Sequence, residues 1–170
     1  LDPQRIREAE ENAEMAEVTD RVRFLVGDIT DAQIKEATVV TLYLLNSINV
    51  RVRPLLFQQL RPGTRVVSHA FHMGEWETAN TLRHPKARNN LIYMWIIPAP
   101  AGGTWTWSSP VADRREWFAL DIEQEFQMLS ARLSVDGAAD VLVTEAQING
   151  SEITLEAECP IFGSKTIVYY

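Results

Sequence analysis

The chain has 170 residues, of which 46% are hydrophobic and 23% are charged, as in an ordinary globular protein. Its net charge of −7 is uneven: residues 1–98 carry twelve basic and twelve acidic side chains, whereas residues 99–170 carry four and eleven. This balance repels phosphate, so we expect no nucleic-acid partner. No apolar run is long enough for a membrane-spanning helix, so we expect no membrane partner either.

The single cysteine, Cys159, has no partner for an intrachain disulfide, and we interpret it as an inert, partly buried thiol. The chain begins at Leu1 without a basic start or an apolar core, so no signal peptide is predicted. This beginning is typical of a processed or fragmentary N-terminus. The compartment, cytoplasmic or exported, therefore stays open.

The first predicted element is a helix that begins at Pro3. Asp2 is a favourable N-cap, and Pro3 suits the first helical position because its missing N–H would be unpaired there anyway. Thr19 and Asp20 are predicted to end this helix. Its apolar face consists of Ile6, Ala9, Ala13 and Ala16.

A strand and a short helical link are predicted next. Alternating apolar residues over Arg21–Val26 indicate a strand, and Thr30–Glu36 is typical of a short helix. The following stretch predicts a strand, a helix and a strand. Thr38–Leu45 is a continuous apolar run, which favours a strand buried on both faces, and Asn46–Leu60 has helical spacing. Thr64–Phe71 then returns to a strand pattern.

A strand–helix–strand unit of this kind joins two parallel strands. The alternation up to Phe71 therefore predicts an α/β fold with a parallel sheet. Ligands bind such sheets beyond the carboxyl ends of the strands. Three loops consequently hold the candidate site: Gly27–Ile29, Tyr43–Asn49 and His69–Trp76.

The polar stretch His72–Asn90 is predicted to be a long excursion, either a lid or a connection to an edge hairpin. Leu91–Ile97 is a dense strand pattern, and Pro98–Gly103 reads as a linker. We therefore predict two domains, residues 1–98 as a partial α/β domain and residues 99–170 as a small antiparallel β domain.

The second predicted domain shows only strand patterns. The apolar alternation through Phe118–Met128 changes phase at Ala131, which suggests a bulge or a bend. Asp136-Gly137 predicts a turn, Asn149-Gly150 predicts a hairpin, and Lys165–Tyr170 predicts a last strand. Two interpretations exist for the tryptophans Trp105, Trp107 and Trp117: they fill a small core, or they form a sugar- or peptide-binding surface. We favour the core.

Several motifs in residues 1–98 occur in a familiar order. They are Leu1-Asp2-Pro3-x-x-Ile6, Val26-Gly27-Asp28-Ile29, Tyr43-Leu44-Leu45-Asn46, the run from Leu60 to Val67, and Phe71-x-Met73-Gly74-x-Trp76. In this order and spacing the chain resembles a class I S-adenosylmethionine-dependent methyltransferase with a Rossmann-like sheet. The stretch Asn46–Ser68 also resembles the corresponding part of non-SET protein-lysine methyltransferases.

The resemblance implies a set of cofactor contacts. Asp28 would accept a hydrogen bond from the adenine amino group of S-adenosylmethionine, and the Ile29 N–H would meet the ring. Leu1 would lie against the adenine face, and Asp2 falls at the helix-cap position beside it. Thr41 and Leu42 would border the methionine end of the cofactor.

The resemblance also implies a place for the methyl acceptor, a small molecule or a protein side chain. Tyr43 would border its entrance, and Asn46 and Asn49 would hold it. His69 is a candidate general base, since imidazole accepts a proton near neutral pH. His69 and His72, with Glu75 nearby, would have to converge to bind a metal. A strand end does not place residues i and i+3 on one face, so we predict no metal.

Structural alternatives exist for three of these residues. Asp28 would equally cap the short helix that follows it. Tyr43 would equally be a buried strand residue with its hydroxyl bonded. Asn46, together with Ser47, would form only the cap of the next helix, an interpretation that we favour over contact with the acceptor.

The glycine-rich loop of the family does not occur among the 170 residues. We therefore expect the chain to hold only the later part of a cofactor site, to bind S-adenosylmethionine weakly and to be inactive by itself. An alternative function is a non-catalytic binding module with a degenerate methyltransferase fold. A truncated sheet exposes strand edges, which favours a homodimer.

Overall fold

The structure is a computed structural model that describes residues 3–83, 90–159 and 163–169. The chain divides into two compact units, Leu1–Ile34 and Lys35–Tyr170, which are treated separately below. The predicted domain boundary at residue 98 stays a prediction. Leu1, Asp2 and the side chain of Cys159 lie outside the described part, so the expectations for them cannot be compared with the structure.

The first unit begins with helix α1 (Pro3–Met15). The helix ends at Met15, earlier than the predicted Thr19-Asp20, because the chain forms a left-handed C-terminal turn. Glu17 has φ 54°, and the N–H of Val18 donates to the carbonyl of Ala13 over 3.0 Å. This is the Schellman arrangement, which usually contains glycine at that position, so no residue type here signals it.

The predicted strand over Arg21–Val26 is wrong. The segment is irregular, and Val22, Leu25 and Val26 are 41%, 69% and 56% exposed. A strand needs a hydrogen-bonded neighbour, and no described strand pairs with this segment. The predicted helical link shrinks to the single 3₁₀ turn η1 (Ile29–Asp31).

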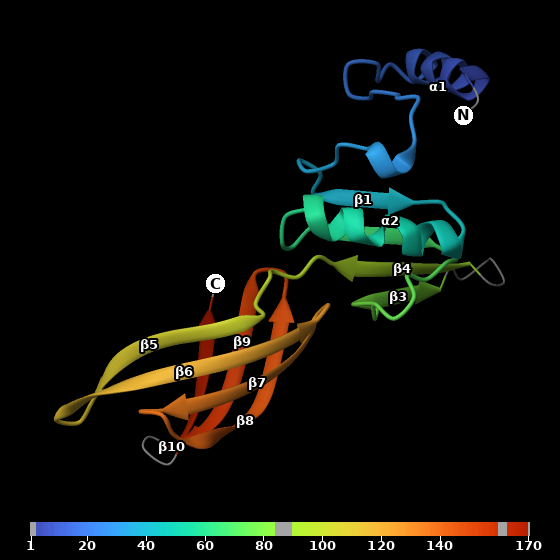
Figure 1. Ribbon diagram of the computed structural model, residues 1–170. Helices are drawn as coiled ribbons and strands as arrows, with labels where there is room; N and C mark the ends of the chain where they lie inside the picture. Colours follow the sequence, from blue (N-terminus) through green and yellow to red (C-terminus); the bar gives the residue numbers. More distant parts are fainter. Residues whose placement is uncertain (1–2, 84–89, 160–162, 170) are drawn as a thin grey trace. The chain divides into compact units, whose positions relative to one another are not determined.

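The second unit contains the predicted strand–helix–strand motif as β1 (Val39–Leu42), α2 (Asn46–Gln59) and β2 (Arg65–His69). The two strands are parallel, with Val39 opposite Arg65, which confirms the motif. In Figure 1, α2 runs alongside these two strands. Because β1 has only one described neighbour, Val39 remains 43% exposed, and the prediction that this strand is buried on both faces is wrong.

Two further strands complete this sheet, β3 (Asn80–Arg83) and β4 (Leu91–Ile96), in the order β1-β2-β4-β3. Both β2 and β3 pair antiparallel with β4. The polar excursion after His72 therefore leads to an edge hairpin, one of the two predicted alternatives. The general α/β class holds, but the sheet is mixed, and the parallel Rossmann-like sheet of the prediction is not shown.

The rest of the unit is an antiparallel sheet in which each strand pairs with the next along the chain. We call this sheet the β module (Figure 1). Its strands are β5 (Gly103–Val111), β6 (Arg114–Glu125), β7 (Met128–Val135), β8 (Ala138–Asn149), β9 (Glu152–Cys159) and β10 (Gly163–Tyr169). Alternate side chains of β6 to β9 supply its apolar core, among them Leu120, Leu133 and Leu155.

The turns of the β module test the sequence predictions directly. Asp136 and Gly137 have φ 50° and 69°, and Gly150 has φ 61°, so both predicted turns are confirmed. The phase change before Ala131, predicted as a bulge or a bend, arises because the chain reverses in a tight turn at Phe126 and Gln127, which joins two separate strands, β6 and β7. The pairing of β7 with β8 also shifts register between Met128 and Leu133.

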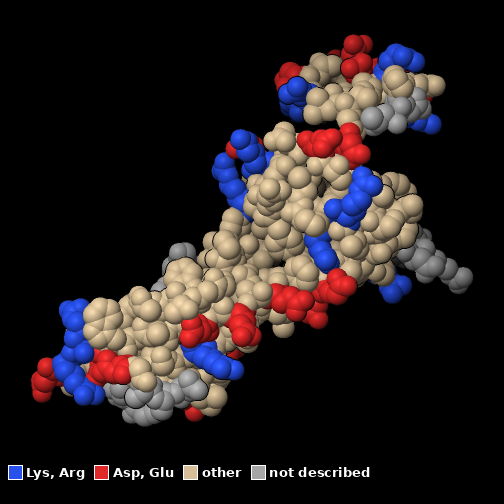
Figure 2. Space-filling view, viewed as in Figure 1, with Lys and Arg blue, Asp and Glu red and all other residues tan. Residues whose placement is uncertain are grey.

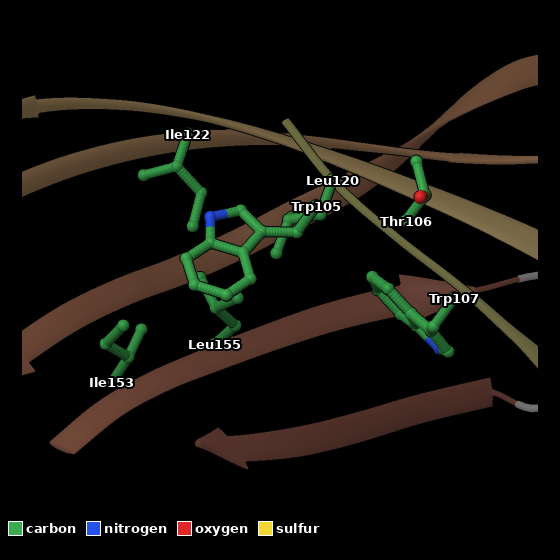
Figure 3. Close-up of a pocket in the computed structure, with 7 residues that line it drawn as sticks. All are labelled: Trp105, Thr106, Trp107, Leu120, Ile122, Ile153 and Leu155. Carbon is green, nitrogen blue, oxygen red and sulfur yellow. The ribbon is translucent and has the colours of Figure 1, made fainter. Parts of the chain in front are cut away.

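The prediction that three tryptophans fill the core is wrong for two of them. Trp105 is 46% exposed and Trp117 is 59% exposed, whereas Trp107 is half-buried and stacks on Phe118 with ring centroids 5.3 Å apart. Trp105 and Trp107 help to line a cavity of about 120 Å³ over the apolar core (Figure 3). Its lining is almost entirely apolar, and it is partly open to the surface beside Trp105.

No helix in the described ranges is both long and apolar enough to cross a membrane.

Candidate functional site

The candidate site lies at the sheet edge where the parallel strands β1 and β2 end. Parallel strands bring their carboxyl ends to the same edge, which is where α/β proteins bind ligands. Two short segments, Tyr43–Leu45 and His69–Phe71, line a cavity of about 260 Å³ there. The structure therefore brings together two of the three loops that the sequence predicted.

Tyr43 and His69 both line this cavity, and we call this pair the mouth. Their rings stack with centroids 5.1 Å apart and planes inclined by 25°. Tyr43 is 84% exposed, so the alternative in which it is a buried strand residue is wrong. Immediately before it, Thr41 is exposed and Leu42 is only 8% exposed, because strand residues alternate between faces.

The loop that follows β2 turns sharply. Ala70 has φ 63° and Gly74 has φ 70°, both in the left-handed region. A Cβ at Gly74 would lie 3.1 Å from the Nη1 atom of Arg53, so this position favours glycine on two counts. We call residues 70–77 the site loop.

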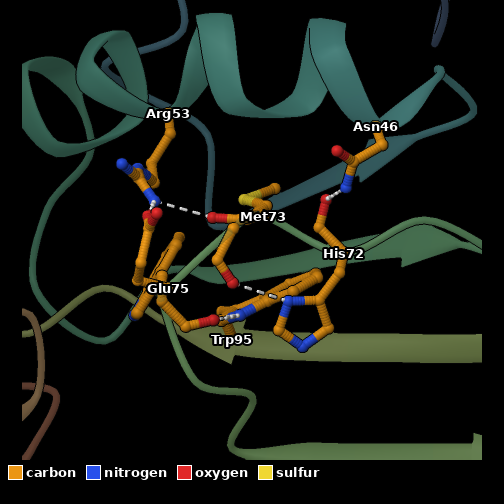
Figure 4. Close-up of polar contacts among 8 residues, drawn as sticks. Asn46, Arg53, His72, Met73, Glu75 and Trp95 are labelled. Atoms are coloured by element: carbon orange, nitrogen blue, oxygen red, sulfur yellow. Dashed lines mark hydrogen bonds and ion pairs between the residues drawn. The ribbon is translucent and has the colours of Figure 1, made fainter.

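Helix α2 holds the site loop from one side (Figure 4). Asn46, Asn49 and Arg53 lie three and four residues apart, which places them on one face of the helix. All three donate hydrogen bonds to successive carbonyls of the loop. The bonds are Asn46 Nδ2 to His72 at 3.0 Å, Asn49 Nδ2 to Phe71 at 3.2 Å, and Arg53 Nη1 to Met73 at 2.7 Å.

Asn49 is the most deeply placed of these polar groups. It is fully buried, and its Nδ2 also donates to the Oγ of Ser68 over 2.9 Å. Its Oδ1 has no hydrogen-bond partner within the described part of the chain. Asn46 is exposed and is the first helical residue, since Leu45 occupies the cap position. The alternative in which Asn46 is only the helix cap is therefore wrong.

Further contacts fix the far end of the site loop. Glu75 has a pKa below its ordinary value, because its backbone N–H and the guanidinium of Arg53, 3.1 Å away, stabilise the carboxylate. The Nδ1–H of His72 donates to the carbonyl of Gly74, and Trp95 Nε1 donates to the carbonyl of Trp76 over 2.9 Å. The loop is thus a bonded structure rather than a free lid.

The first unit contains the predicted adenine contact. Asp28 caps η1, because its Oδ1 accepts bonds from the backbone N–H of Thr30 at 2.9 Å and from its hydroxyl at 2.7 Å. The capping alternative is therefore observed. The cofactor roles of Asp28 and Ile29 stay predictions, and those of Leu1 and Asp2 fall outside the described residues.

Sequence reasoning missed two site residues. Arg53 was overlooked because its role depends on a loop twenty residues away, although its helical spacing from Asn46 and Asn49 was a usable signal. Ser68 was read only as part of a strand. In the described part of the chain, no group of three His, Cys, Asp or Glu side chains is placed to hold a metal ion.

Comparison with known proteins gives three related findings. The model of the ANTKMT methyltransferase domain family matches residues 1–80. A curated protein-lysine N-methyltransferase from Saccharolobus islandicus (strain REY15A) is 38% identical over 98 residues, which cover 57% of this chain and 61% of that protein. This chain therefore spans about 61% of the length of that relative.

A solved structure is also similar. The crystal structure of an RNA methyltransferase from Salinibacter ruber in complex with S-adenosyl-L-homocysteine matches with a TM-score of 0.53 and 48% identity, covering 56% of this chain and 61% of that one. Together the three findings support a methyltransferase fold. The RNA named in this last relative stands against our expectation of no nucleic-acid partner.

Proposed function

We propose that the chain forms part of an S-adenosylmethionine-dependent methyltransferase and that its methyl acceptor enters at the mouth formed by Tyr43 and His69. The observation that carries this proposal is the cavity at the joint carboxyl ends of β1 and β2. It lies within residues 1–80, the segment matched by the methyltransferase family model.

The residues at the mouth fit this chemistry. S-adenosylmethionine, when bound, supplies a methyl group on a cationic sulfur. The exposed ring of Tyr43 offers a π face to a cation, and the apolar Leu44 and Leu45 also line the cavity. Our proposal gives His69 the task of accepting the acceptor's proton and gives the site loop the task of orienting the acceptor for in-line transfer.

We propose a protein side chain, a lysine, as the acceptor rather than RNA. The six cavity-lining residues include neither Lys nor Arg, the groups that bind a phosphate backbone. Figure 2 shows acidic side chains gathered along the middle of the Lys35–Tyr170 unit. An aromatic mouth whose lining holds neither Lys nor Arg favours a cationic side chain over a polyanion.

Chemical-shift titration of the ¹⁵N-labelled chain tests this proposal, because it detects binding even at roughly millimolar affinity. We expect S-adenosylhomocysteine to shift the amides of residues 41–45 and 69–72. A lysine peptide added to that sample should shift Tyr43 and His69 further, and an RNA oligonucleotide should not. Shifts confined to the β module would contradict the site, and RNA shifts at Tyr43 would contradict the choice of acceptor.

A matched pair of variants controls for nonspecific aromatic contacts. Tyr43 and Trp117 are both exposed aromatic residues, 84% and 59% respectively, but only Tyr43 lies at the cavity. Tyr43→Ala should therefore abolish the peptide-induced shifts, and Trp117→Ala should leave them unchanged. Equal effects of the two variants would show that the peptide binds without using the mouth.

A further inference from the structure

The β6–β7 turn, formed by Phe126 and Gln127, lies against the site loop, although some fifty residues separate the two along the chain. We infer that this turn is a positioning element: it packs against both the site loop and helix α2 and holds the loop in place on that helix. The inference gives the β module a role beyond the proposed methyl transfer. The contacts of the turn are independent of the proposed function. Only the effect of the turn on a bound methyl acceptor rests on that function.

The ring of Phe126 is the centre of the contact. Its centroid lies 5.7 Å from that of Phe57 on α2 and 6.3 Å from that of Trp76 at the end of the site loop. Phe57 and Trp76 are themselves 4.6 Å apart, so the three rings form one cluster. Trp76 is only 1% exposed, which shows that the cluster is well packed.

Arg53 connects this cluster to the site loop. Its guanidinium carbon lies 4.9 Å above the centre of the Phe126 ring, and the same group donates to the carbonyl of Met73. The side chain of Arg53 is only 19% exposed, so the cation–π contact is shielded from water and stronger than a surface one. The turn therefore also fixes the residue that grips the middle of the loop.

Gln127 supplies a second, directional contact. Its Nε2 donates a 3.0 Å hydrogen bond to the backbone carbonyl of Glu77, at the far end of the site loop. A ring contact and a hydrogen bond from adjacent residues restrict both the distance and the orientation of the loop. Neither contact is needed to close the β6–β7 hairpin itself.

The backbone of the turn indicates that Phe126 is retained for its side chain. Phe126 has φ 55°, a conformation that is strained for a bulky residue and natural for glycine at this position of a tight hairpin. Strain of this kind persists where surrounding contacts over-determine it. Here those contacts are the ones with Phe57, Trp76 and Arg53.

Gln124 anchors the turn on its other side. Its Nε2 donates to the carbonyls of Phe126 at 2.8 Å and Ala99 at 3.0 Å, and its Oε1 accepts from the N–H of Ala101 at 2.7 Å. The turn is thereby tied to the segment that links β4 to the β module. The site loop is consequently held by two fixed structures, α2 and the β6–β7 turn.

Hydrogen exchange measured by mass spectrometry tests the inference. Phe126→Gly removes the ring but relieves the backbone strain, so the hairpin should stay protected while amides 70–78 exchange about tenfold faster. The matched control is Ala112→Gly, which relieves a φ of 52° in the β5–β6 turn. It should leave exchange in the site loop unchanged.

A conservative variant separates positioning from general stability. Phe126→Tyr keeps the ring and should restore slow exchange in the site loop. Unchanged loop exchange in Phe126→Gly, or faster exchange spread over β6 to β9 as well, would overturn the inference. These measurements use no cofactor, so a failure of the proposed methyl transfer would leave their outcome intact.

Discussion

At the scale of single residues, burial decides which polar contacts of the site matter for stability. Asn49 and Asn46 both donate an amide hydrogen to the site loop, but Asn49 is fully buried and Asn46 is exposed. A buried hydrogen bond cannot be replaced by one to water, whereas an exposed one can. Their substitution to alanine should therefore have unequal effects.

We expect Asn49→Ala to lower the free energy of unfolding by about 1–3 kcal/mol, because the Ser68 hydroxyl and the Phe71 carbonyl lose their donor. Asn46→Ala should change it by less than about 0.5 kcal/mol. Urea denaturation of the two variants measures both values. Equal losses would show that the cost of burying the Oδ1 atom of Asn49 without a described partner offsets the stabilisation from its donor bonds.

Glu116 and Asp136 form a carboxyl pair at one end of the β module. Glu116 is only 1% exposed, and its pKa is raised by a hydrogen bond shared with Asp136 and by burial. The pKa of Asp136 is lowered, because it accepts bonds from Glu116 and from the N–H of Trp117 at 2.8 Å. Arg114 forms an ion pair with Glu116.

A raised pKa means that the folded protein binds the Glu116 proton more tightly than the unfolded chain does. Its contribution to stability is therefore complete below the unfolded value of 4.5 and is lost as the pH rises through the folded pKa. Glu116→Gln mimics the protonated acid at every pH. We expect the variant to gain stability relative to the native chain as the pH rises from about 4 to about 7. Urea melts across that range measure the difference, and a difference that is constant with pH would contradict this assignment.

At the scale of elements, the periodicity of apolar residues predicted most of the structure that forms between residues close in the sequence. The β1–α2–β2 motif followed from an apolar run, a helical spacing and a Pro62-Gly63 stop. Arg21–Val26 carried an equally good strand pattern and forms none, because a strand depends on a partner that a pattern does not reveal. The β6–β7 hairpin was missed for the opposite reason: Phe126 adopts a turn conformation for which its residue type is no signal.

The candidate site was predictable to the same extent. Tyr43 and His69 were selected because strand ends meet at one edge, and the structure places their rings in contact. The contacts of Arg53 and Phe126 with the site loop depend on packing between segments far apart in the sequence. No local pattern carries that information.

The junction between the mixed sheet and the β module offers a test at this scale. The β8–β9 turn lies against the turn after α2, since a Cβ on Gly150 would come within 3.0 Å of the Cα of Gly63. Gly137, in the β7–β8 turn, has a similar φ of 69° but open space around it. The two glycines therefore share a backbone requirement and differ only in a neighbour.

Gly137→Ala should cost about 1 kcal/mol in unfolding free energy, from the left-handed backbone alone. Gly150→Ala should cost about 2–3 kcal/mol, because the clash with Gly63 adds to the same backbone term. Urea denaturation of the two variants measures both costs. Equal costs would mean that the two sheets separate readily at this junction.

At the scale of the whole molecule, affinity for the cofactor depends on how many of its contacts this chain provides. The 170 residues include the strand ends that border Tyr43 but no glycine-rich loop, the element that approaches a cofactor most closely in Rossmann-like sheets. The chain also spans only about 61% of the length of the two relatives described above. We therefore predict that the chain by itself binds S-adenosylhomocysteine more weakly than about 1 μM.

Isothermal titration calorimetry of the purified chain, with its intact mass checked in the same sample, measures this affinity. The expected result is no saturable heat at micromolar concentrations, together with the weaker shifts at residues 41–45 that the chemical-shift titration detects. Saturable micromolar binding would show that these residues suffice for the cofactor. In that case Tyr43→Ala should reduce the affinity, whereas Ala112→Gly, on a distant turn of the β module, should not.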